Sequence, residues 1–118
     1  MNKIISTLFG ARDTAHKLHL ASRSFAEHLA LSELYDALLE SADSIAEQIQ
    51  GKYGLLDLPE ITDVEFKSSN GADFVRTLAS WAEHSRSEFN PEDTHLLNEW
   101  DVVISAIYRA KYKIENLK

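Results

Sequence analysis

Five side chains in the first half of the chain have the types and spacing of metal ligands. Three are histidines and two are acidic residues one helical turn apart: His16, His19, His28, Asp43 and Glu47. Imidazole nitrogens combined with carboxylates form the ligand sets of non-haem iron sites, including sites built between the helices of a bundle. The chemistry that these residues indicate is therefore the binding of iron.

The spacing also predicts that such a site needs two copies of the chain. His28 and Asp43 are 15 residues apart, which separates them by about 22 Å on one helix, so they cannot bind one ion within a chain. Two such helices packed antiparallel about a two-fold axis bring His28 of one copy to the partner's Asp43 and Glu47. This arrangement gives two equivalent sites in a dimer.

The elements that must position these residues follow from apolar side chains spaced three and four residues apart. They predict helices over about 2–20, 25–50, 72–89 and 91–118, with a long connection at 52–71. Four helices with one long second connection predict an all-α four-helix bundle, in a single domain over residues 1–118. Apolar residues of the connection predict that it packs on the bundle: Leu55, Leu56, Leu58, Ile61, Val64 and Phe66.

Local signals mark the ends of these helices. Ser24 and Glu27 predict a capping box at the start of the second helix, in which each side chain bonds the backbone of the other residue. Gly51 predicts a left-handed stop at the end of that helix. Asn90 and Pro91 predict the N-cap and first residue of the fourth helix, with Glu92 and Asp93 in its first turn.

The second helix carries two stripes of side chains rather than one. Its core stripe consists of Leu31, Leu34, Leu38, Ala42, Ile45 and Ile49. A second stripe, about 100° around the helix, consists of His28, Ser32, Tyr35, Leu39, Asp43, Ala46 and Glu47. A monomeric bundle needs one apolar stripe per helix, so the second stripe predicts a subunit interface.

Composition excludes several other functions. The chain has no cysteine, which excludes disulfides and thiolate metal sites. A net charge of −7 and the lack of a basic tail argue against DNA binding, although an acidic surface attracts Fe²⁺. No apolar run approaches the ~20 residues that cross a bilayer, so we expect a cytoplasmic protein. Glycine-rich phosphate loops and hydrolase motifs are absent.

The histidine and carboxylate pattern resembles the miniferritins of the Dps family (DNA-binding proteins from starved cells). In that family a histidine near the end of the first helix and a second one opening the next helix combine with an Asp-x-x-x-Glu pair fifteen residues further on. His28, Asp43 and Glu47 match this pattern, and SADSIAEQIQGKYG resembles the family's carboxylate segment. The first histidine of the pattern is His19, which is favoured by its His-x-x-His context and by the second-helix start that follows it. The alternative is His16, which has the family's usual separation from His28.

The resemblance implies a ferritin-like bundle and a ferroxidase function. Fe²⁺ would bind between His19 and His28 of one chain and the partner's Asp43 and Glu47, and peroxide or dioxygen would oxidise it. Ferric iron would collect in a hollow oligomer of two-fold dimers, by resemblance a dodecamer. Zinc or manganese are possible substitutes for iron. Compact ferritin-like proteins encoded by bacteriophages are also similar.

The chain departs from the family in ways that leave a rival interpretation open. Ser32 stands where the family has an acidic residue four beyond the second histidine, so that a second iron would rely on water or Asp36. The family's lysine-rich tail is missing. The rival is a non-catalytic helical interaction protein with a degenerate metal site. His84 and His95 are interpreted as ordinary structural or surface residues, although Glu92 and His95 have the Glu-x-x-His spacing of larger di-iron bundles.

Overall fold

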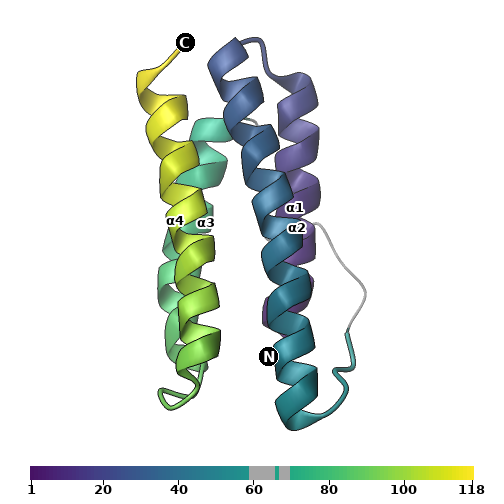
Figure 1. Ribbon diagram of the computed structural model, residues 1–118. Coiled ribbons are helices and arrows are strands. Elements are labelled where there is room, and N and C mark those ends of the chain that lie inside the picture. The colour runs from purple at the N-terminus through teal and green to yellow at the C-terminus, as the bar shows by residue number, and fades with distance from the viewer. Residues whose placement is uncertain (59–65, 67–69) are drawn as a thin grey trace.

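Four α-helices lie side by side in the computed structural model of the chain, which describes residues 1–58, 66 and 70–118 (Figure 1). The helices account for most of the chain, as the sequence predicts. A short 3₁₀ turn, η1 (Arg86–Glu88), follows the third helix. The four helices are α1 (Asn2–Ala21), α2 (Phe25–Tyr53), α3 (Gly71–Ser85) and α4 (Thr94–Asn116).

Contacts between helix ends define the direction of each helix. The Glu27 carboxylate accepts a hydrogen bond from the Gly71 amide, so α2 and α3 begin at the same end of the molecule. Lys113 near the end of α4 pairs with Glu33 near the start of α2. Thus α2 runs antiparallel to α1 and α4 and parallel to α3 (Figure 1). The end of α2 and the start of α3 therefore lie at opposite ends of the bundle, whereas only three residues separate α1 from α2.

The core lies where the apolar stripes of the helices meet. The predicted core stripe of α2 is confirmed, because all six of its side chains are at most 2% exposed. In α4, Trp100 and Ile107 are buried, whereas Leu97 and Ile104 are only partly buried. The remaining fully buried positions of α4 are Leu96, Val103, Ala106 and Ala110. The core face of α4 therefore follows Leu96, Trp100, Val103 and Ile107.

Trp100 ties α4 to the end of α3. Its ring is fully buried, and its Nε1 donates a 2.8 Å hydrogen bond to the carbonyl of Ala82. Ala82 lies in the last turn of α3, where carbonyl groups lack partners within the helix. This one hydrogen bond therefore gives the buried indole N–H an acceptor and gives a carbonyl at the end of α3 a donor.

Two predicted helix ends are wrong by three residues. Helix α2 continues through Gly51 to Tyr53, and Gly54, with a φ of +100°, ends it. Helix α4 begins at Thr94, because Asn90 instead forms a turn, accepting hydrogen bonds from the amide of Glu92 at its side chain and of Asp93 at its carbonyl. Glu92 and Asp93 thus precede α4 rather than lying in its first turn.

The predicted capping box is half right. The Ser24 hydroxyl accepts from the Glu27 amide at 3.3 Å, as predicted. The Glu27 carboxylate does not return to Ser24, whose amide donates to Ser22 Oγ instead. Glu27 accepts from the Gly71 amide at 2.9 Å, so it caps α3. A backbone amide 44 residues away competes successfully for a carboxylate that local sequence assigns to its own helix.

The described part of the connection packs on the bundle only in places. Phe66 is 6% exposed and its ring meets Phe74 and Trp81 edge-on. Leu56 is partly buried against the core, but Leu55 and Leu58 are exposed, contrary to the prediction. Ile61 and Val64 lie outside the described residues. None of the described helices combines the length and apolar content needed to cross a membrane.

Candidate metal centre

His19 and His28 face each other across the turn that joins α1 to α2. His19 Nδ1 lies 2.7 Å from the carbonyl oxygen of His28, and His28 Nδ1 lies 2.8 Å from the carbonyl oxygen of His19. The two rings stack with centroids 3.6 Å apart and planes inclined by 20°. The structure therefore places His19, rather than His16, beside His28.

These hydrogen bonds place a proton on the Nδ1 atom of both rings. A carbonyl oxygen can only accept, so each Nδ1 must carry a proton and donate it. In a neutral imidazole the other nitrogen, Nε2, then keeps its lone pair. Histidines that bind metals usually donate their second nitrogen to a carbonyl or carboxylate in this way. In its neutral form, each histidine can therefore bind a metal ion through the lone pair of Nε2.

The stacking constrains how these nitrogens can bind. An imidazole binds a metal in the plane of its ring, about 2 Å from the nitrogen. Planes inclined by only 20°, with the rings 3.6 Å apart, meet well beyond that distance. One ion cannot lie in both planes unless the rings separate. In the observed arrangement, therefore, each ring would have to bind its own ion.

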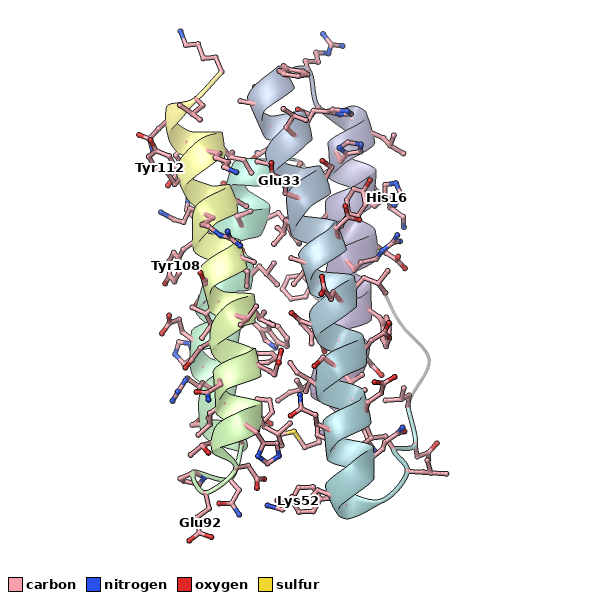
Figure 2. All side chains as sticks on the ribbon, in the orientation of Figure 1. His16, Glu33, Lys52, Glu92, Tyr108 and Tyr112 are labelled. Carbon is pink, nitrogen blue, oxygen red and sulfur yellow. The ribbon has the colours of Figure 1, made fainter. Side chains whose placement is uncertain are left out.

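His16 belongs to the same cluster but contacts a different partner. Its ring stacks on Tyr35 of α2, with centroids 4.2 Å apart, and lies 6.0 Å from the ring of His19. Tyr35 also meets the ring of His19 edge-on at 5.4 Å, and the Arg12 guanidinium lies over it at 5.3 Å. Tyr35 thus packs within the α1–α2 hairpin. Figure 2 shows His16 towards the end of the molecule where that hairpin turns.

The predicted carboxylate ligands lie on α2, well away from the histidines. Asp43 and Glu47 are both exposed, and within the described residues neither has a hydrogen-bond or ion-pair partner. Because α2 is continuous from Phe25 to Tyr53, the 15 residues from His28 to Asp43 correspond to about 22 Å. The described residues of one chain contain no group of three or more potential metal ligands.

The remaining candidates take ordinary positions. Asp36 is exposed on α2, and the Ser32 hydroxyl donates to the carbonyl of Leu29 at 2.9 Å. His84 is exposed, with its Nδ1 2.7 Å from the Ser80 carbonyl one turn earlier in α3. His95 is exposed in the first turn of α4.

A buried carboxylate at the opposite end of the bundle was not foreseen from the sequence. Asp93 is 1% exposed and accepts hydrogen bonds from Lys52 and Tyr53 at the end of α2. The Lys52 ammonium, followed by the Tyr53 hydroxyl, lowers the pKa of Asp93. Lys52 also makes an ion pair with Asp93. The only local signal is an acidic residue just before a helix, which is equally typical of an ordinary N-cap.

Comparison with known proteins places the chain in a family but gives no function. The family model that matches describes a family of unknown function, DUF5856, and covers residues 19–114. No curated protein and no solved structure matches the chain. The matched segment includes both histidines of the stacked pair, all of α2 and nearly all of α4. The chain therefore belongs to the DUF5856 family.

Proposed function

We propose that this chain is a ferritin-like protein of the Dps type, which binds Fe²⁺ at sites shared between two copies and oxidises it. The observation that carries the proposal is the reciprocal pair of His19 and His28. Its hydrogen bonds hold both rings in the tautomer that leaves Nε2 for a metal. Two antiparallel helix pairs linked by one long crossover, which is the topology of ferritin-like folds, add support.

The partner's Asp43 and Glu47 would complete the ligand set. In an antiparallel dimer of α2 helices, the carboxylates of one copy reach the histidine pair of the other at both ends of the interface. Carboxylates are hard anionic ligands. Their negative charge stabilises bound Fe³⁺ more than bound Fe²⁺, which favours oxidation of the ion. Asp43 and Glu47 are one helical turn apart, so both carboxylates can reach one ion or bridge two.

The reaction is the oxidation of iron as substrate. Two Fe²⁺ ions each give up one electron to a hydrogen peroxide molecule, its O–O bond breaks, and two protons complete two molecules of water. Dioxygen is the alternative oxidant. The ferric product would then collect inside a hollow oligomer built from these dimers.

The direct test is iron oxidation started with peroxide after anaerobic loading, followed by ferric absorbance. The chain should oxidise Fe²⁺ well above the buffer rate and keep the product soluble. His28→Asn and Asp43→Asn should each lower the rate to near that of buffer, because each removes one metal ligand.

Matched control variants are available on the same chain. His84→Asn replaces an exposed histidine whose Nδ1 also donates to a carbonyl, and Asp57→Asn replaces an exposed carboxylate outside the helices. Both should oxidise iron like the native chain. Native protein that oxidises iron no faster than buffer would sink the proposal.

One observation favours the rival, a helical interaction protein without catalysis. Ser32 occupies the position one turn beyond His28, and its hydroxyl is bonded to the Leu29 carbonyl. It therefore supplies no charge for a second ion. The rival predicts equal, background oxidation rates for the native chain and for both ligand variants.

A further inference from the structure

Helix α2 has an exposed surface on which apolar and acidic side chains alternate. Phe25 is 71% exposed, Leu29 43% and Leu39 38%. We call this surface the α2 flank: Phe25, Leu29, Asp36, Leu39, Asp43 and Glu47, all exposed. Exposed apolar side chains gathered on one side of a helix are typical of a protein-contact surface.

A second copy of this chain fits the α2 flank better than an unrelated partner. The helix carries histidine nitrogens near its start and free carboxylates about 22 Å further on. These groups complement each other only when two α2 helices lie antiparallel. The proposed iron site is also incomplete without the second copy, since the described residues of one chain bring together no set of three ligands.

The charges on the α2 flank oppose this pairing when no metal is present. If His28 lies opposite the midpoint of Asp43 and Glu47, the two-fold axis passes between residues 36 and 37, so the two Asp36 carboxylates face each other. Each copy contributes three carboxylates, Asp36, Asp43 and Glu47, and within the described residues none of them has an ion-pair partner. Like charges brought together where water is partly excluded repel strongly.

We infer that divalent metal ions control the association of two copies: the α2 flanks repel each other until Fe²⁺ occupies the shared sites. This inference rests on the proposed function, because it uses the same His19–His28 pair and the same carboxylates. Each bound Fe²⁺ adds two positive charges at one end of the interface and links a histidine of one copy to a carboxylate of the other. Linkage makes the effect reciprocal, so association must tighten iron binding by the same factor.

The first experiment is sedimentation velocity over a range of protein concentrations, in EDTA and in Fe²⁺ under argon. We expect self-association to be about tenfold tighter or more with Fe²⁺, a coupling of ordinary size. In EDTA, added salt should strengthen association, because it screens the repulsion. Equal association in EDTA and Fe²⁺ would overturn the inference.

Variants separate the charge effect from the ligand effect. Asp36→Asn keeps the proposed ligands and removes the repulsion at the two-fold axis, so it should associate more tightly than the native chain in EDTA. Asp57→Asn, which removes an exposed carboxylate outside α2, should behave like the native chain. His28→Asn and Asp43→Asn should lose the response to Fe²⁺. An Asp36→Asn chain that associates no more tightly than Asp57→Asn would contradict the charge argument.

The same samples distinguish failure of this inference from failure of the proposed function. Native protein that is fully associated in EDTA but oxidises Fe²⁺ well above buffer would overturn metal control and leave the shared iron site standing. Native protein that stays monomeric with Fe²⁺ and oxidises it at the buffer rate would overturn both.

Discussion

His19 and His28 hold the ends of α1 and α2 together through a symmetric exchange of hydrogen bonds, each Nδ1 donating to the other residue's carbonyl. Nδ1 of each ring therefore stabilises the turn between the helices, and Nε2 remains for binding a metal ion. Because the two tasks use different atoms, substitutions can separate them.

We expect His28→Asn and His28→Ala to differ in stability but not in iron oxidation. The Asn amide nitrogen can take the place of Nδ1 and keep the bond to the His19 carbonyl, so its cost should stay below about 1.5 kcal/mol. Alanine removes the donor and the stacked ring, and should cost about 1–3 kcal/mol. Urea unfolding followed by circular dichroism measures both, and oxidation rates should be near background for both. Equal stability of the two variants would argue against a structural role for Nδ1.

Glu27 and Gly71 should behave as a coupled pair. A Cβ built on Gly71 would lie only 2.4 Å from Glu27 Oε1, so Gly71→Ala must displace the carboxylate that caps α3. We expect Gly71→Ala and Glu27→Ala each to cost about 1 kcal/mol, the usual value of a helix cap. The double variant should cost less than the sum, because alanine at 71 meets no obstacle once Glu27 is gone. Additive losses in urea unfolding would show that the two residues act independently.

Asp93 should make the stability of the protein sensitive to acid. Lys52 and then Tyr53 hold its pKa in the folded state below the ordinary value of about 4. A lowered folded pKa means that the stabilisation is complete above about pH 4 and is lost as the pH falls through the folded pKa. The urea midpoint of the native chain should therefore fall more steeply than that of Asp93→Asn between about pH 5 and pH 3. Parallel pH profiles for the two proteins would contradict this assignment, and Asp57→Asn, an exposed carboxylate, serves as the control.

Trp100→Phe should destabilise the junction of α3 and α4. The substitution removes the Nε1 donor and leaves the buried Ala82 carbonyl without this bond, and it also leaves a cavity in the core. We expect a loss of about 2–4 kcal/mol from these two effects together. Chemical unfolding monitored by circular dichroism provides the measurement. Trp81→Phe, at a partly buried position, should cost less, and a larger loss there would place the main aromatic anchor at Trp81.

The parts of the fold that sequence reasoning predicted depend on repeated local patterns. The core stripe of α2 is an example, because six apolar side chains at steps of three and four leave one face to bury. The errors arise where a residue far away in the sequence determines a helix end or the partner of a side chain. Asp93 is held by Lys52 and Tyr53, about forty residues earlier, and α4 begins after it rather than at Asn90. Glu27 is similarly drawn to Gly71.

The end of α2 shows a different limit of prediction. Gly51 and Gly54 can both end a helix, and the sequence alone gives no reason to prefer the second. In the structure a Cβ on Gly51 would meet nothing within 4 Å, so this glycine sits in an ordinary helical turn. Only Gly54 has the positive φ.

Some features of the candidate metal site could be predicted from the sequence, and others could not. The residue types and the spacing of His28, Asp43 and Glu47 are visible in the sequence, as is the need for a second chain. The sequence context favours His19 over His16, and the structure agrees, because the short turn at 22–24 brings His19 beside His28. The sequence does not predict the stacking of the His19 and His28 rings, because this contact forms only where the two helices meet at the turn.

The short turn between α1 and α2 also bears on how the chain folds. Closing a three-residue turn between two helices carries a small entropic cost, whereas the crossover 54–70 must order a much longer segment before α3 and α4 can dock. We therefore expect the α1–α2 hairpin, with the histidine pair at its tip, to form early in folding. Substitutions at His19 and His28 should slow refolding as well as speed unfolding, whereas those at Trp100 should act mainly on the unfolding rate.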